Sequence, residues 1–270
     1  NAHNHLFEEI AKFRCARRMW AKIAREEFGA KDDRSAAMRF HTQTAGSMLT
    51  SQQPDNNVVR VTIQALAAIL GGTQSLHTNG RDEALSLPTA EAARLALRTQ
   101  QILANESGVA DVVDPLGGAP MIEALTDELE AAVLELMAQV DERGGAVDAI
   151  ASGFVQREIH ASALAWQREV EAGERPVVGV NSYQVEEEPP SISRPDPSQR
   201  AEVMRDLEEV RAERDAAAVE GALQSVKRVA QSDENLMPAL VEAVGKYATL
   251  GEISGVLQGV FGDHRAVESI

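Results

Sequence analysis

The sequence has little of what disulfide-bonded, membrane-spanning or nucleic-acid-binding proteins require. Cys15 is the single cysteine among 270 residues, which excludes an internal disulfide and disfavours a cysteine-based zinc site. No stretch approaches the roughly 18 consecutive apolar residues of a membrane-spanning helix, so no membrane partner is expected. Lys and Arg number 26 against 42 Asp and Glu, and a net charge of −16 disfavours binding to phosphate backbones. We therefore expect no nucleic acid partner.

The remaining composition is that of a globular protein. Hydrophobic residues make up 44% and charged residues 25% of the chain, which is enough apolar surface for a large core. No secretory signal is visible, and with one cysteine we expect a reducing, cytoplasmic setting. The chain begins with Asn, which predicts either processing of the front or a fragment.

Residues 1–146 alternate between helical and strand-like patterns. Apolar spacing predicts helices over about 6–29, 55–70, 89–104 and 122–143, and short apolar segments predict strands at 37–42, 73–78 and 110–114. Strands alternating with such helices favour parallel pairing through right-handed crossovers. An open doubly wound sheet and a (β/α) barrel both fit, and both place function at the carboxyl ends of the strands.

Residues 147–270 have a different pattern. We expect a helix over 147–172, a short strand or extended segment at 177–181 and a proline-rich, charged linker at 186–197. One long helix is predicted over 198–230, followed by two shorter ones over 236–250 and 250–261. This part is interpreted as an appended helical region.

Polar side chains gather around the first two predicted strands. His41 and Gln43 belong to the first, and Gln74, His77 and Asn79 to the second. A neutral histidine and amides both donate and accept hydrogen bonds, which suits an uncharged or carbonyl-bearing ligand. The alternative is that they satisfy buried backbone groups at the strand ends, and the residues alone leave both open.

The other motifs are weaker. His3 and His5 have no third ligand nearby, so no metal site is expected. Asp82 and Glu83 either hold the hydroxyls of a ribose or favour the start of the next helix. The sequence contains neither a phosphate-binding glycine loop nor a nucleophile elbow.

Two long stretches carry a specific resemblance. Residues 39–60 read RFHTQTAGSMLTSQQPDNNVVR, and residues 65–89 read ALAAILGGTQSLHTNGRDEALSLPT. With EEIAKFRCARRMWA before them and ESGVADVVDPLGG, GERPVVGVNSYQ and VFGDHR after them, they resemble the large subunit of the adenosylcobalamin-dependent acyl-CoA mutases, of the methylmalonyl-CoA mutase type. The resemblance covers essentially the whole chain.

The resemblance implies an α/β fold in two parts. Residues 1–146 would be the C-terminal portion, about strands six to eight, of a (β/α)8 TIM barrel that binds acyl-CoA. Residues 147–270 would be a helical region that leads to, or docks, a cobalamin-binding domain or subunit. Implied partners are the acyl-CoA substrate and that fused or separate cobalamin-binding part, in a homodimer, heterodimer or heterotetramer.

The resemblance also implies roles for individual residues. His41, Gln43 and Gln74 match positions that contact the acyl-CoA substrate. Asn79 and Glu83 match positions that hold the ribose of the 5′-deoxyadenosyl group of adenosylcobalamin. The implied reaction is a radical rearrangement of the acyl carbon skeleton, in which the cofactor supplies the chemistry. No catalytic acid, base or metal ligand is expected in this stretch.

Some of the family's pattern has no match here. Its main catalytic histidine, and the tyrosine and arginine that select the acyl group, belong upstream of residue 1. The Asp-x-His-x-x-Gly motif of the cobalamin domain is also without a match. Methylmalonyl-, isobutyryl-, ethylmalonyl- and 2-hydroxyisobutyryl-CoA therefore remain open as substrates, as does a non-catalytic paralogous subunit. We expect this chain alone to be inactive.

Overall fold

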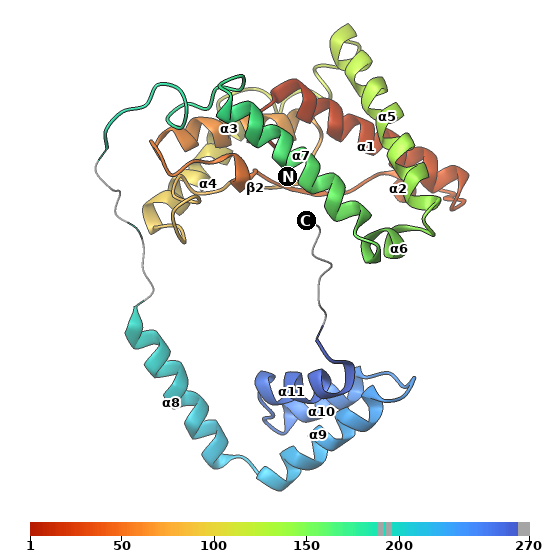
Figure 1. Cartoon of the computed structure of the whole chain (residues 1–270), viewed down its shortest axis with the longest axis vertical. Coiled ribbons are helices and arrows are strands. Elements are labelled where there is room, and N and C mark those ends of the chain that lie inside the picture. The colour runs from red at the N-terminus through yellow and green to blue at the C-terminus, as the bar shows by residue number, and fades with distance from the viewer. Residues whose placement is uncertain (188–191, 193–195, 264–270) are drawn as a thin grey trace. The chain divides into compact units, whose positions relative to one another are not determined.

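The computed structural model describes residues 1–187, 192 and 196–263, which fall into two compact units divided within the predicted linker (Figure 1). The sequence predicted a different division, between a barrel part up to residue 146 and a docking region from residue 147. That functional division stays a prediction. Most of the linker predicted at 186–197 lies outside the described residues.

The first unit is mostly helical with a small parallel sheet. Its elements are α1 (Leu6–Glu26), α2 (Asp33–Ala36), β1 (His41–Gln43), the 3-10 helix η1 (Gly46–Met48), α3 (Asn56–Leu70), β2 (Ser75–His77), α4 (Ala90–Asn105), α5 (Pro120–Asp141), α6 (Ala146–Ala151) and α7 (Phe154–Glu171). The four helices predicted before residue 146 are confirmed by α1, α3, α4 and α5. The second predicted strand is confirmed in shorter form by β2. Of the first, predicted at 37–42, only His41 and Thr42 belong to β1, which extends to Gln43.

The sheet is a strand–helix–strand unit. β1 and β2 pair in parallel, with His41 opposite Ser75 and Gln43 opposite His77, and α3 makes the crossover between them. Ala2 adds an isolated parallel bridge to the residue that follows β1. The parallel arrangement expected from the alternating pattern is therefore confirmed for these two strands.

Small residues let α1 and α3 pack closely over one face of the sheet. Phe13 of α1 stacks on Phe40, with ring centroids 5.3 Å apart, and packs against Ala68 of α3. Gly71 ends α3 directly against this ring, because a Cβ added there would lie 2.7 Å from two Phe13 carbons. A residue without a side chain is thus required where the helix passes the aromatic ring.

The third predicted strand, at 110–114, is wrong. The segment forms turns in which the Asp111 N–H donates to the Gly108 carbonyl and the Gly117 N–H to the Asp114 carbonyl. Val113 is 97% exposed. A strand needs a neighbour that completes its ladder of hydrogen bonds, and no segment within the described residues pairs with this one.

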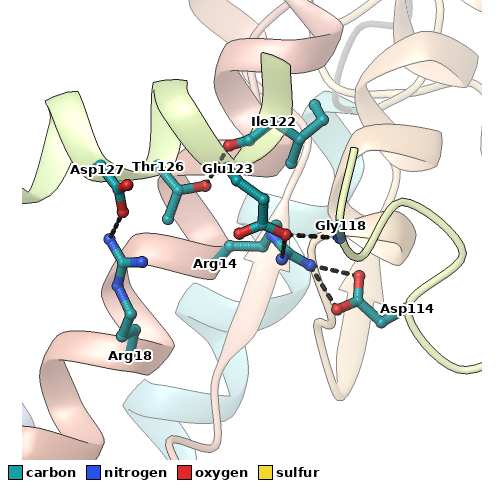
Figure 2. A network of polar contacts seen from close by, with 8 residues as sticks. All are labelled: Arg14, Arg18, Asp114, Gly118, Ile122, Glu123, Thr126 and Asp127. Carbon is teal, nitrogen blue, oxygen red and sulfur yellow. Dashed lines mark hydrogen bonds and ion pairs between the residues drawn. The ribbon is translucent and has the colours of Figure 1, made fainter. Parts of the chain in front are cut away.

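Ion pairs join both this turn and α5, which follows it, to α1 (Figure 2). Arg14 pairs with Asp114 and with Glu123 of α5, the latter at 2.6 Å. Glu123 also accepts a 2.8 Å hydrogen bond from the Gly118 N–H, and Arg18 pairs with Asp127 at 2.7 Å. These contacts bind both the turn and α5 to α1.

The packing of α1 against α5 bears on the predicted barrel. α1 precedes the first of the three predicted strands and α5 follows the third, and helices separated by three strands lie apart in a closed eight-stranded barrel. In the structure they lie side by side (Figure 1). The TIM barrel is therefore not shown by the described residues, although their α/β character is.

Two predictions for the end of the first unit need correction. The helix expected over 147–172 is divided into α6 and α7 at Gly153, whose φ of +74° is in the left-handed region. The segment at 177–181 is a tight turn closed by a hydrogen bond from the Gly179 N–H to the Ser182 carbonyl. A glycine in the left-handed conformation accounts for both interruptions.

The second unit contains α8 (Pro197–Glu213), α9 (Ala216–Ala230), α10 (Met237–Gly245) and α11 (Leu250–Phe261). The prediction of a single helix over 198–230 is wrong, because the helix is interrupted at Arg214 and Asp215. Asp215 caps α9 by accepting from the Ala217 N–H at 2.9 Å, and Arg214 pairs with Glu252 of α11. The last two predicted helices are confirmed.

An apolar cluster joins α9, α10 and α11. Its buried members are Val219, Ala222, Val226, Val229, Ala239, Ala243, Ala248 and Ile253. Within the described ranges, no helix of either unit is both long and apolar enough to cross a membrane.

Candidate functional site

The exposed face of the two strands carries the predicted polar residues. Thr42 points to the core and is fully buried, whereas His41 and Gln43 on either side of it are exposed. The same alternation exposes Ser75 and His77 of β2. His41 Nδ1 lies 2.7 Å from Ser75 Oγ, so the register brings hydrogen-bonding groups of both strands together.

Asn79 is held between the two strand ends. It is only 2% exposed, and its backbone N–H donates to Thr44 Oγ1 at 2.9 Å. Its Nδ2 donates to the Thr44 carbonyl at 2.9 Å, and its Oδ1 accepts from Gln43 Nε2 at 2.9 Å. The structure therefore joins Gln43 and Asn79, which the resemblance assigns to different ligands.

Glu83 lies next to Asn79, across η1. A Cβ added at Gly46 would lie 3.3 Å from Asn79 Nδ2, 3.3 Å from Glu83 Cγ and 3.4 Å from Glu83 Oε1. Gly46 thus lies against both Asn79 and Glu83, and Gln43 is bonded to Asn79, so the exposed Glu83 borders this group of residues. Thr44 and Gly46 had no predicted role, and the only signal for them is a small polar residue and a glycine within three residues of the strand end.

Gln74 lies apart from this group. It precedes β2, at the end of that strand opposite Asn79. Its Oε1 accepts from the Phe40 N–H at 2.7 Å, and its Nε2 donates to the Gly72 carbonyl at 2.8 Å. Both ends of the amide therefore bind backbone groups, which fits the alternative that these polar residues satisfy the backbone at the strand ends. The substrate role of Gln74 stays a prediction.

Asp82 serves the start of a helix. It is 8% exposed, and its Oδ2 accepts from the Thr89 N–H at 2.8 Å, just before α4. Of the two uses that the sequence left open for the acidic pair, the contacts of Asp82 fit helix initiation. The exposed Glu83 carboxylate is left as the member able to meet hydroxyl groups.

A cavity of about 670 Å³ opens beside the same loop. Residues within 53–56, 81–91 and 185–187 line it. Arg81 spans it by pairing with Asp55 at 2.7 Å and with Glu91 at 3.4 Å. Asp55 directly precedes α3 but makes no side-chain cap to it, and its carboxylate pairs with Arg81 instead.

Nucleophilic and metal chemistry find no support in the described residues. Burial raises the pKa of the Cys15 thiol, which disfavours the reactive thiolate. No group of three or more His, Cys, Asp and Glu side chains in the described ranges is arranged to hold a metal ion. The candidate site is instead a set of hydrogen-bonding groups on β1, β2 and their following loops.

Comparison with known proteins gives one consistent family. The methylmalonyl-CoA mutase family model matches residues 1–263. The chain is 47% identical over 262 residues to the 2-hydroxyisobutanoyl-CoA mutase large subunit of Aquincola tertiaricarbonis. This match covers 96% of the chain and 47% of that relative. It is 46% identical over 258 residues to the methylmalonyl-CoA mutase of Escherichia coli (strain K12), covering 95% of the chain and 36% of the relative.

A more distant relative agrees. The probable mitochondrial methylmalonyl-CoA mutase of Caenorhabditis elegans is 42% identical over 268 residues, covering 98% of the chain and 36% of the relative. The chain thus spans between about a third and a half of the length of these relatives. Because the match extends over nearly every residue of the chain, the chain belongs to the methylmalonyl-CoA mutase family.

Proposed function

We propose that this chain contributes to the substrate and cofactor sites of an adenosylcobalamin-dependent mutase that rearranges the carbon skeleton of an acyl-CoA. The observation that carries the proposal is the contact between Gln43 and Asn79, with Glu83 beside them. It joins a residue assigned to acyl-CoA with residues assigned to the adenosyl group, and a mutase must hold these two reactants next to each other.

The chain's own residues fit a positioning role. The exposed His41 and Gln43 offer donors to the carbonyl groups of an acyl-CoA, while the exposed Glu83 carboxylate can accept hydrogen bonds from ribose hydroxyls. Asn79 is almost fully buried and bonded to Gln43, so we expect it to support Gln43 as well as the adenosyl group. When bound, adenosylcobalamin supplies the radical chemistry.

The proposed substrate is methylmalonyl-CoA, in exchange with succinyl-CoA. The Escherichia coli relative supports this assignment, and the equally similar relative from Aquincola tertiaricarbonis supports 2-hydroxyisobutyryl-CoA as the second candidate. Isobutyryl- and ethylmalonyl-CoA stay within the same class. Retention of His41, Gln43, Gln74, Asn79 and Glu83 argues against a non-catalytic paralogous subunit.

The proposed assembly includes a cobalamin-binding domain or subunit and a dimer or heterotetramer. The name "large subunit" of one relative favours a separate cobalamin-binding partner. The (β/α)8 barrel, the docking role of residues 147–270 and the cytoplasmic setting belong to the same proposal.

Glu83→Gln tests the site. In the complete polypeptide encoded by the reading frame, assembled with its cobalamin-binding part, we expect turnover to fall about 10- to 100-fold, because a hydrogen bond to a charged acceptor contributes about 1.5–3 kcal/mol. Glu106→Gln, at an exposed position after α4, is the matched control and should keep the wild-type rate. An unchanged rate for Glu83→Gln, with the fold intact, would remove Glu83 from the site.

A further inference from the structure

Asn57 is a buried amide whose hydrogen-bonding capacity is fully used. It lies in the first turn of α3 and is fully buried. Its Nδ2 donates to the Thr50 carbonyl at 2.8 Å and to the Arg81 carbonyl at 2.9 Å. Its Oδ1 accepts from the Thr50 N–H at 3.1 Å and from Arg60 Nη1 at 2.8 Å. Two donors and two acceptor sites are all that an asparagine side chain offers.

The partners of Asn57 belong to two different loops. Thr50 lies in the loop that follows β1, the strand that carries His41 and Gln43. Arg81 lies midway between Asn79 and Glu83 in the loop that follows β2. One side chain therefore binds the backbone of the loop that follows Gln43 and the backbone of the loop that carries Asn79 and Glu83.

Arg60 reinforces this junction. The guanidinium is half-buried, and its other contacts are to neutral oxygens: Thr50 Oγ1 at 2.9 Å and the Val178 carbonyl at 2.7 Å. Burial lowers the pKa of Arg60. A cationic donor on Oδ1 polarises the amide of Asn57 and strengthens the bonds that its N–H groups make.

We propose that Asn57 is a positioning residue that fixes the loop after β1 relative to the loop after β2, and so sets the spacing between bound acyl-CoA and bound adenosyl group. The inference rests on the proposed function. Asn57 touches neither ligand, because its whole side chain is enclosed by protein. It acts through Thr50 and Arg81.

Asparagine is the residue that this junction requires. An aspartate at position 57 keeps the size and the two acceptor contacts but places an oxygen against the Thr50 and Arg81 carbonyls. The loops then separate, and both ligand sets loosen together. A purely structural asparagine would lower the melting temperature while the remaining folded protein bound its ligands as before.

The test is Asn57→Asp in the complete polypeptide, assembled with its cobalamin-binding part and assayed well below its melting temperature. We expect kcat/KM to fall about 100-fold, as for a misplacement of about 1 Å, with KM for acyl-CoA and Kd for adenosylcobalamin both raised. Asn105→Asp is the matched control, since Asn105 is exposed on α4 and bonds only the Gln101 carbonyl among described residues. Unchanged KM and Kd beside a lowered melting temperature would overturn the proposal.

Hydrogen–deuterium exchange on the same proteins tests the junction without any ligand. Exchange should quicken in both 44–53 and 79–83 for Asn57→Asp and in neither for Asn105→Asp; release of only one loop, or of neither, would refute the inference. If the wild-type assembly turns over no acyl-CoA yet both loops are released, the proposed function fails while the junction stands. Should Asn57→Asp not fold, Arg60→Lys keeps the charge but loses the forked contacts, and we expect smaller changes in the same direction.

Discussion

The two units of this molecule bury different kinds of side chain. The buried residues of the first unit include amides, hydroxyls and carboxyls, among them Thr42, Thr44, Asn57, Gln64, Thr78, Asn79 and Asp82. Among the described residues of the second unit, every buried side chain is apolar. An apolar cluster stabilises helices but tolerates small shifts, whereas a paired polar group holds its partners at fixed distances. The proposed site lies in the unit whose interior has that property.

The largest effect on stability is expected from giving the second unit a buried hydroxyl. Val226 is fully buried in the apolar cluster, and Val226→Thr keeps its shape while adding one polar atom. We expect the free energy of unfolding of this unit to fall by about 2 kcal/mol. Hydrogen exchange would measure it as weaker protection across 216–261, with residues 41–83 unchanged. Weaker protection of 41–83 as well would contradict this prediction.

The reverse exchange in the first unit should cost less stability but affect the site. Thr44→Val keeps the shape and removes the hydroxyl that accepts from the Asn79 N–H. We expect a loss of about 1–2 kcal/mol, because one buried donor is left unpaired. Since Asn79 supports Gln43, KM for acyl-CoA should rise as well. A stability loss with KM unaltered would mean that the buried polar groups of this unit are structural only.

The smallest effect on stability is expected from lowering the pH, and it should appear in the second unit. A forked pair with Arg214, at 2.7 and 2.5 Å, and the Thr249 N–H hold the pKa of Glu252 well below its usual range. A carboxyl with a lowered folded pKa stabilises the fold above its unfolded pKa, about 4.3, and loses that contribution as the pH falls further. The melting temperature of the second unit should fall between pH 5 and 2, and Glu252→Gln should reduce that fall. A wild-type melting temperature that stays constant over this range would contradict the lowered pKa of Glu252.

The sequence was most informative where periodicity and local signals agree. The apolar spacing of α1, α3, α4 and α5 placed those helices, and Thr89 caps α4 where its helix was expected to start. At Gly153 and Asp215 the local stop and start signals were present, but helical periodicity on both sides concealed them. The apolar residues 110–114 have a strand's composition but no neighbour among the described residues, and only the tertiary structure reveals that.

The candidate site, too, could be predicted from the sequence only in part. The meeting of Gln43 with Asn79 follows from two parallel strands whose ends lie side by side. The resemblance assigns a role to Glu83, but the residues alone do not distinguish Glu83 from Asp82, because the contact of Asp82 with the Thr89 N–H depends on how the loop folds. Asn57 reads in sequence as part of a helix start, because its partners at Thr50 and Arg81 are brought to it only by folding.

The most direct test of the account is a substrate-panel isomerisation assay on the complete polypeptide, assembled with a cobalamin-binding subunit and adenosylcobalamin. The panel contains methylmalonyl-, isobutyryl-, ethylmalonyl- and 2-hydroxyisobutyryl-CoA. We expect cofactor-dependent turnover of one of these, with methylmalonyl-CoA first, and none by residues 1–270 alone. A folded complex that binds cobalamin but isomerises none of the four would contradict it.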